Sequence, residues 1–271
     1  MPASDASFRS KYGPWALIAG ASVGLGAEFG RQLAARGFHL VLVARRPGPL
    51  EQHARDLEAE FGVEARTATV DLASPDLMLA LRDKTRDLEI GLLVYNAALS
   101  PIGLHLEQEL DEKLKVIDVN CRAPLVLIHE FGRPMVARGH GGIILMSSMA
   151  GLQGSALIAA YAGTKAYSRV LGEGLWDELH DRGVDVLAFC AGATRTPNFE
   201  LSQPRRTGFL SAPMEAAPVV SEALAKLGRQ PSALAGFRNR LAGFVMTRLL
   251  PRRVAVRTIG KAMRAMYAEQ R

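Results

Sequence analysis

The stretch Gly20-Ala-Ser-Val-Gly24-Leu-Gly26 decides the fold, because it lies between an apolar run at residues 15–19 and an amphipathic run at residues 25–36. Glycines at this spacing allow a tight turn from a strand into a helix, and they let backbone N–H groups approach a pyrophosphate at the positive helix end. A glycine turn can also serve only the packing of strand on helix. The strand before it and the helix after it favour a dinucleotide-binding turn.

The rest of the first 190 residues repeats this alternation of apolar runs with helix-length segments. Each apolar run is nearly continuous, which is typical of strands buried on both faces of a parallel sheet. The pattern predicts a doubly wound α/β fold of the Rossmann type. The predicted strands are residues 15–19, 39–43, 64–70, 90–95, 142–147 and 184–189. The predicted helices are residues 25–36, 50–61, 75–86, 107–138 and 157–182, with Gly37, Gly62, Gly139 and Gly183 as helix-ending residues.

Composition bounds the class of protein. The 271 residues are 48% apolar and 22% charged, which is the balance of a soluble globular protein and excludes disordered and fibrous chains. No repeat or linker divides the chain, so we predict a single domain, residues 1–271. Within it, residues 12–196 form the cofactor and catalytic core, residues 197–228 a substrate lid and a following helix, and residues 229–271 a basic helical extension.

The net charge of +6 originates at the C-terminal end. Residues 226–271 contain 11 basic residues and one acid, a net charge of +10, and the preceding residues carry −4. A basic excess can indicate nucleic acid, a membrane surface or phosphorylated ligands as partners. This segment has neither groove-reading residues nor stacking aromatics, so we expect no nucleic-acid partner.

Targeting signals and metal motifs are not recognisable. Residues 1–14 hold charged residues and no apolar core of a secretory signal, and no apolar stretch reaches the roughly 18 residues of a membrane span. Cys121 and Cys190 lie far apart, without the spacing of metal ligands. We therefore expect a cytoplasmic protein with reduced thiols, no transmembrane segment and no metal.

The end of the second predicted strand indicates the cofactor. A diphosphate-only dinucleotide favours an acid there for its ribose hydroxyls, whereas this chain reads Val43-Ala44-Arg45-Arg46. Two guanidinium groups suit a 2′-phosphate, which arginine holds by charge-assisted hydrogen bonds, and Ser22 in the glycine turn could add a hydroxyl. A solvated arginine pair is the alternative. The missing acid favours NADP(H).

A possible proton-transfer group follows the fifth predicted strand. Tyr161 and Lys165 are four residues apart, hence on one face of a helix, and a neighbouring ammonium lowers the pKa of a phenol towards the range of a general acid or base. Ser148 closes the strand before them, at the edge where α/β sheets bind ligands.

In this order, the motifs resemble those of the short-chain dehydrogenase/reductase family in its compact form, from about residue 12 to residue 196. The resemblance implies an oxidoreductase with a catalytic tetrad at Asn120, Ser148, Tyr161 and Lys165. The cofactor-binding residues, from the resemblance and the residue patterns together, are Gly20, Ser22, Gly24, Leu25, Gly26, Arg45, Arg46, Asp71, Leu72, Asn96, Ala97, Tyr161, Lys165 and Thr196. Among them, Asp71 is expected to contact adenine and Thr196 the nicotinamide amide.

The roles implied by the resemblance agree with the chemistry of the side chains. Ser148 orients the substrate oxygen, Tyr161 exchanges the proton, and Lys165 lowers the tyrosine pKa and holds the nicotinamide ribose. Asn120 links the lysine to solvent. Three positions depart from the family pattern: Ala19, Ala98 and Ala191 replace a threonine, a glycine and a proline. All the proton-transfer groups remain.

Substrate and assembly are less specified. The lid segment carries Phe199, Leu201, Phe209 and Leu210, and Met149, Leu152 and Gln153 would line the opposite wall. They favour a hydrophobic carbonyl or alcohol substrate, for which the resemblance suggests a steroid-like or 3-oxoacyl compound, although these residues could simply pack the lid down. Small residues on the Tyr161 helix favour a homodimer or homotetramer, or else close packing on the sheet.

The C-terminal extension departs from the usual family ending. Residues 232–236 predict a short seventh strand, residues 215–227 a helix before it, and residues 237–250 and 251–267 two helices with apolar residues among arginines. Such helices can lie on an anionic membrane, bind an acidic acyl carrier or coenzyme A phosphates, or pack on the domain with their arginines extended to solvent. Packing on the domain is the favoured interpretation.

Two other functions were weighed against an oxidoreductase. A noncatalytic NADP-binding regulatory or scaffold protein would use the same fold, but it would not need Ser148, Tyr161 and Lys165 together. Sugar epimerases and dehydratases share the tyrosine and lysine pair, but their glycine turn is spaced differently. The intact catalytic set favours the oxidoreductase.

Overall fold

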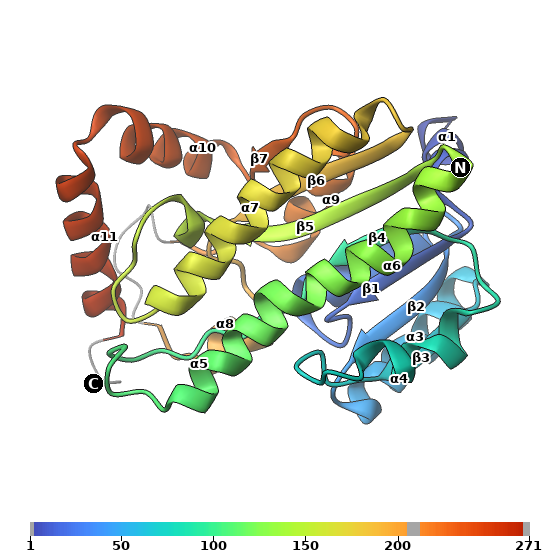
Figure 1. Cartoon of the computed structure of the whole chain (residues 1–271), viewed down its shortest axis with the longest axis horizontal. Coiled ribbons are helices and arrows are strands. Elements are labelled where there is room, and N and C mark those ends of the chain that lie inside the picture. Colours follow the sequence, from blue (N-terminus) through green and yellow to red (C-terminus); the bar gives the residue numbers. More distant parts are fainter. Residues whose placement is uncertain (1–2, 205–211, 268–271) are drawn as a thin grey trace.

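The computed structural model describes residues 3–204 and 212–267, and its centre is a seven-stranded parallel sheet (Figure 1). The strand order is β3-β2-β1-β4-β5-β6-β7. Strands β2 and β3 are added on one side of β1 and strands β4 to β7 on the other, so the order of strands reverses between β1 and β4. This is the predicted doubly wound fold. The strands are β1 (Trp15–Ala19), β2 (His39–Ala44), β3 (Ala65–Thr69), β4 (Ile90–Tyr95), β5 (Gly141–Ser148), β6 (Val184–Ala191) and β7 (Ser232–Leu234).

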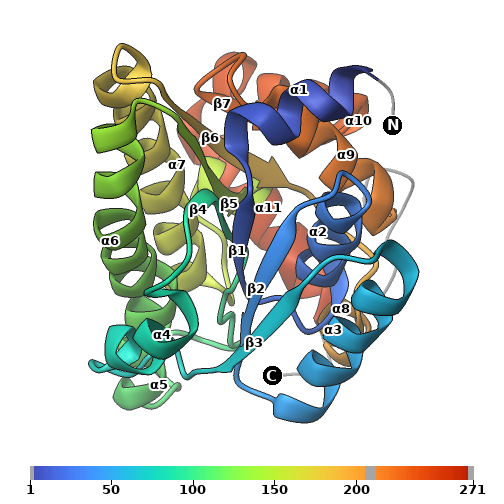
Figure 2. The ribbon, with the colours of Figure 1, turned by 90° about the vertical axis from the view of Figure 1, so that its right-hand side faces the viewer.

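Helices cover both faces of the sheet (Figure 2). One layer is α2 (Gly24–Ala34), α3 (Pro47–Phe61) and α9 (Ala216–Lys226), and the other is α4 (Leu77–Thr85), α6 (Ala123–Arg138) and α7 (Ala159–His180). Successive side chains of β1 enter the two cores alternately: Ile18 packs with Phe29 of α2, and Leu17 packs on the side of Leu127 of α6. This two-sided burial explains why the strands are continuously apolar.

Left-handed glycines end two of the helices as predicted. Gly62 follows α3 with φ +66°, and Gly139 follows α6 with φ +76°. An L side chain rarely adopts this conformation, so glycine is favoured at both positions.

The helix predicted over residues 107–138 is interrupted. It consists of α5 (Leu110–Ile117), a π-helical turn (Asp118–Arg122) and α6. Pro124 has no N–H to donate to the carbonyl of Asn120 four residues earlier, so regular α-helical bonding cannot continue through this point. Such π turns often occur at functional sites, and this one contains Asn120.

The N-terminal residues form a helix that the sequence analysis did not predict, α1 (Ala3–Tyr12). Its last residues are attached at the amino end of β6. There the Tyr12 hydroxyl donates to Asp185 at 2.5 Å, and Lys11 forms an ion pair with the same carboxylate. Arg9 donates to the carbonyl of Gly37 at 2.6 Å. The helix therefore closes the end of the sheet remote from the expected site.

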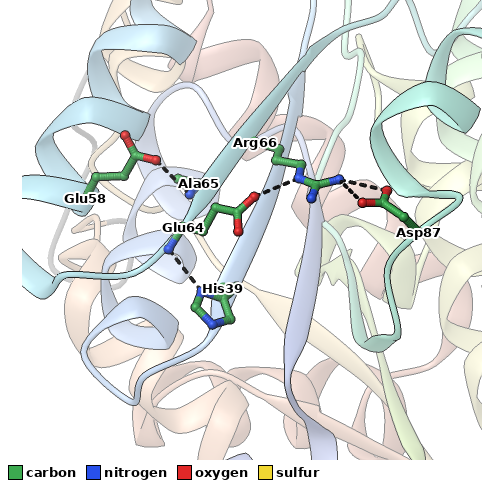
Figure 3. A network of polar contacts seen from close by, with 6 residues as sticks. All are labelled: His39, Glu58, Glu64, Ala65, Arg66 and Asp87. Atoms are coloured by element: carbon green, nitrogen blue, oxygen red, sulfur yellow. Dashed lines mark hydrogen bonds and ion pairs between the residues drawn. The ribbon is translucent and has the colours of Figure 1, made fainter.

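Charged side chains cover the free edge of the sheet at β3 (Figure 3). Arg66 lies between Glu64 and Asp87, with nitrogen–oxygen distances of 2.9 and 2.8 Å. The backbone N–H of Glu64 donates to His39, and that of Ala65 to Glu58, each at 3.0 Å. Exposed ion pairs contribute little stability, but charge on an edge strand opposes pairing with another sheet.

The C-terminal segment follows the predicted plan. Strand β7 pairs in parallel with β6, and it leads into α10 (Phe237–Phe244), a π turn (Val245–Leu249) and α11 (Arg252–Met266). The lid region contains a short helix, α8 (Pro197–Leu201); Phe209 and Leu210 lie outside the described residues. In the part of the chain that the structure describes, the helices are all too short or too polar to cross a membrane.

Candidate active site

The glycine turn lies at the carboxyl end of β1 and leaves no room for side chains. A Cβ atom on Gly20 would lie 2.8 Å from the backbone nitrogen of Ala97, and one on Gly26 only 1.9 Å from the carbonyl oxygen of Gly20. The Asn96 side chain donates to that same carbonyl at 3.0 Å. The predicted residues Asn96 and Ala97 thus press against the turn. The space between these two residues and the start of α2 admits glycine backbone but no side chain.

The ends of β2 and β3 bring the predicted Arg45, Arg46, Asp71 and Leu72 to the same edge of the sheet. Both arginines are exposed, and within residues 3–204 and 212–267 neither side chain makes a hydrogen bond or an ion pair. Asp71 is exposed and accepts a hydrogen bond from Ala73, whereas Leu72 is buried. Two guanidinium groups without ion-pair partners, near the backbone N–H groups of the glycine turn, suit a dinucleotide that carries an additional phosphate.

Thr196 and Ser22 complete this edge. A Cβ atom on Gly24 would lie 2.9 Å from the Thr196 methyl group, which places the start of the lid directly against the glycine turn. The Thr196 hydroxyl accepts a hydrogen bond from the N–H of Phe199 at 3.2 Å and so fixes the beginning of α8. Ser22 is half-buried in the turn. The backbone of this turn would suit the phosphates of a dinucleotide, and Ser22 and Thr196 would lie beside them.

Ser148, Tyr161 and Lys165 come together between β5 and α7. Ser148 is the last residue of β5, and its side chain lies beside that of Tyr161, close enough to act on the pKa of the phenol. Lys165 lies one helical turn after Tyr161, with its nitrogen 5.6 Å from the centre of the tyrosine ring. This nitrogen is buried and donates to the carbonyl of Met146 at 2.6 Å.

The protonation of this group differs from the expectation. Burial raises the pKa of Tyr161, and the hydrogen bond from Ser148 opposes the rise only in part. Burial lowers the pKa of Lys165 to about 8. Lys165 is not among the groups that shift the pKa of Tyr161, so the predicted lowering of the tyrosine pKa by Lys165 is not found in this structure. The phenol is therefore protonated at neutral pH.

Asn120 lies in the π turn and joins two segments of the site. Its side-chain oxygen accepts from the N–H of Leu99 at 2.8 Å, and its side-chain nitrogen donates to the Leu99 carbonyl and to the Thr164 hydroxyl, both at 2.9 Å. Thr164 precedes Lys165. The asparagine thus fixes the loop after β4 against α7 at the level of the lysine.

Tyr267 is a site residue that the sequence analysis missed. It follows α11 and is only 9% exposed, and its hydroxyl lies 3.5 Å from that of Ser202, beyond the end of α8. It also contributes to the raised pKa of Tyr161, which places the two phenols in one environment. The two tyrosines are far apart in the sequence, and no spacing rule connects them.

The wall after Ser148 is covered by the C-terminal segment. Leu152 and Gln153 are buried, and the Leu152 carbonyl accepts a hydrogen bond from Arg252 at 3.0 Å. A Cβ atom on Gly260 of α11 would lie 3.6 Å from the Ala156 methyl group. Helix α11 therefore covers the loop that continues from the catalytic strand.

The comparisons with known proteins agree with this geometry. The family model described as short chain dehydrogenase matches residues 14–206. The chain belongs to the short-chain dehydrogenase family. The predicted family, fold and enzyme class are thereby confirmed, and this chain is an oxidoreductase.

Relatives that the chain resembles include hydroxysteroid dehydrogenases and 3-oxoacyl-CoA reductases. It is 32% identical to a 7beta-hydroxysteroid dehydrogenase of Clostridium sardiniense over 86% of this chain and 90% of that protein. It is 35% identical to a very-long-chain 3-oxoacyl-CoA reductase of Neurospora crassa over 74% of this chain and 61% of that protein.

Two solved structures extend the comparison. A 7beta-hydroxysteroid dehydrogenase structure, determined to explain stereoselectivity, has a TM-score of 0.87 and 29% identity, over 93% of this chain and 98% of that one. A short-chain dehydrogenase from Sphingobium yanoikuyae in complex with NADPH has a TM-score of 0.77 and 30% identity, over 87% of this chain and 94% of that one. Related short-chain dehydrogenases thus bind NADPH on this fold.

Proposed function

We propose that this chain is an NADP(H)-dependent oxidoreductase that interconverts a ketone and a secondary alcohol, with Tyr161 as the general acid and base. The observation that carries the proposal is the placement of the Ser148 side chain beside Tyr161, where it acts on the pKa of the phenol, with buried Lys165 one helical turn away. A noncatalytic scaffold would have no need to bring these three side chains together. A screen of ketones and alcohols for NADPH consumption or formation tests the proposal.

Each side chain has a role that follows from its surroundings. Ser148 holds the substrate oxygen beside the phenol, and Tyr161, protonated at neutral pH because burial raises its pKa, donates the proton during reduction. Lys165 would hold a ribose hydroxyl of the bound cofactor and return a proton, and its pKa of about 8 suits that exchange. Asn120 positions the lysine through Thr164. The bound cofactor supplies the hydride.

Arg45 and Arg46 support the choice of NADP(H). They are exposed and have no acidic partner among the described residues, and no acid occupies the end of β2. We propose that they hold the 2′-phosphate, that Ser22 adds a hydroxyl, and that Asp71 contacts the adenine, with Leu72 and Leu25 beside it.

Replacing Arg45 and Arg46 together by alanine is expected to raise the KM for NADPH by about 10- to 100-fold and to leave the KM for NADH nearly unchanged. The reason is that hydrogen bonds to a charged group contribute about 1.5–3 kcal/mol. Steady-state kinetics with both cofactors measure this. Arg55→Ala, an exposed arginine further along α3, is the matched control. An unchanged preference for NADPH in the double variant would refute the assignment.

The proposed substrate is hydrophobic, either steroid-like or a 3-oxoacyl compound. Its support is the buried apolar wall at Leu152 and Leu157, half-buried Phe199 in the lid, and the names of the relatives, which act on hydroxysteroids and very-long-chain 3-oxoacyl-CoA. The division into a core at residues 12–196, a lid and helix at 197–228 and an extension at 229–271 belongs to the same proposal.

We also propose a homodimer or homotetramer that forms through α6 and α7. Small residues of α7 divide into two sets: Gly172 contacts Ala188 of the sheet, whereas Gly163 and Gly174 face open space. Val170 of α7 and Leu125 of α6 are 60% and 50% exposed. The second set could receive a helix of another subunit. Analytical ultracentrifugation should show the assembly, and a species of monomer mass alone would refute it.

A further inference from the structure

The C-terminal helices carry a surface that the proposed reaction does not use. Residues 237–267 contain eight basic residues and no acid. In Figure 1, α10 and α11 form one corner of the molecule, at the end of the sheet opposite β3 and α3. The basic residues are Arg238, Arg240, Arg248, Arg252, Arg253, Arg257, Lys261 and Arg264.

Helix α10 presents its apolar side to solvent. Phe237, Leu241 and Phe244 recur at helical spacing on one face, and they are 72%, 53% and 55% exposed. The opposite side, at buried Gly243, packs so closely that a Cβ atom would lie 2.5 Å from Leu234. Leu249, in the following π turn, is 62% exposed. The prediction that these apolar residues pack on the domain is wrong for this stripe, because small residues make the contact instead.

Helix α11 packs on the domain through small residues and exposes cations. Ala255 and Gly260 are buried against the domain, and the Arg252 side chain donates a hydrogen bond to the Leu152 carbonyl. Four cations face solvent: Arg253, Arg257, Lys261 and Arg264. Within the described ranges, the side chains of these four residues make no hydrogen bond or ion pair. The corner therefore combines an apolar stripe with unpaired positive charge.

We propose that this corner, residues 237–264, docks the protein on an anionic membrane surface. Exposed phenylalanine and leucine side chains insert at the boundary between headgroups and acyl chains, and the cations pair with lipid phosphates. A second copy of this chain would bring cations against cations, so the charge disfavours self-association through this face. The same segment covers the wall beside Ser148, which would bring a hydrophobic substrate in the membrane close to the site.

The test is flotation of the full chain with vesicles of phosphatidylcholine alone and of phosphatidylcholine with phosphatidylglycerol. We expect binding to the anionic vesicles only, with release at high salt. Arg253→Gln, Arg257→Gln and Lys261→Gln together should weaken this binding by about a hundredfold, because each cation near an anionic surface contributes on the order of fivefold. Leu241→Ser with Phe244→Ser should weaken it as well.

The matched control is Arg82→Gln, Lys84→Gln and Arg86→Gln, which removes three exposed cations on and just after α4, at the other end of the molecule. It should bind vesicles as the wild type does. All variants should retain activity on a water-soluble ketone, which shows that they are folded. Failure of the wild type to bind anionic vesicles, or equal binding by both triple variants, would overturn the proposal. So would a Leu241→Ser, Phe244→Ser variant that changes the sedimenting mass and leaves vesicle binding unaltered.

Discussion

Replacing Tyr161 by phenylalanine is expected to lower the turnover of ketone reduction by about 10²- to 10⁴-fold, the range credited to a positioned acid or base. The change removes one oxygen, the phenol oxygen beside Ser148. The ring remains, so the contact with Lys165 and the packing of α7 should persist. The affinity for NADPH, measured by fluorescence titration, should change little.

Tyr167→Phe is the matched control for this experiment, because it removes the same oxygen from a half-buried tyrosine on the same helix, away from Ser148. Its turnover should equal that of the wild type. If Tyr161→Phe were fully active, Tyr161 would not be the proton donor. If it lost NADPH binding together with activity, the effect would lie in the cofactor site and not in proton transfer.

Replacing Gly26 by alanine is expected to weaken NADPH binding by roughly 10- to 100-fold, since overpacking of this kind costs about 1–3 kcal/mol. The new methyl group would lie 1.9 Å from the carbonyl oxygen of Gly20 and 2.7 Å from the Asn96 side chain. The first is a backbone atom, so the turn itself must move. Because the phosphates would contact this backbone, the displacement acts directly on the cofactor.

Gly24→Ala and Gly48→Ala serve as comparison variants, one at a less crowded position and one at an open position. At Gly24 the added methyl would meet the side chain of Thr196 at 2.9 Å and strain a φ of +62°, whereas Gly48 in the first turn of α3 has nothing within 4 Å. Calorimetric titration with NADPH should show the largest loss for Gly26→Ala and none for Gly48→Ala. Thermal unfolding without cofactor separates a damaged turn from a damaged fold. Wild-type affinity in a folded Gly26→Ala variant would contradict the cradle.

The sequence predicted the sheet well because its strands are buried on both faces. An apolar run such as Ile90–Tyr95 has one plausible environment in a protein of this composition, and glycines at Gly62 and Gly139 end the helices between the runs. The interruption around Asn120 was missed, because the apolar period continues through it and only Pro124 signals the change. Helix α1 was missed because its short sequence has no strong apolar period.

The candidate site was predictable as far as its residues adjoin strand ends. Gly20, Arg45 and Asn96 directly follow β1, β2 and β4, and Ser148 ends β5, so a parallel sheet brings all four to one edge. Contacts across the finished fold were not accessible. Neither the approach of Tyr267 to Tyr161 nor the preference of Lys165 for the Met146 carbonyl can be read from spacing. The outward stripe on α10 was missed because helical periodicity does not say which face is covered.

Transfer of deuterium from labelled NADPH to a hydrophobic ketone tests the central claim most directly. The cofactor carries deuterium at its transferable position, and mass spectrometry follows the alcohol product. The account predicts one deuterium in each alcohol formed, in amounts equal to the NADPH consumed, and a loss of both in Tyr161→Phe. NADPH binding without any labelled alcohol, across steroid-like and 3-oxoacyl substrates, would contradict it.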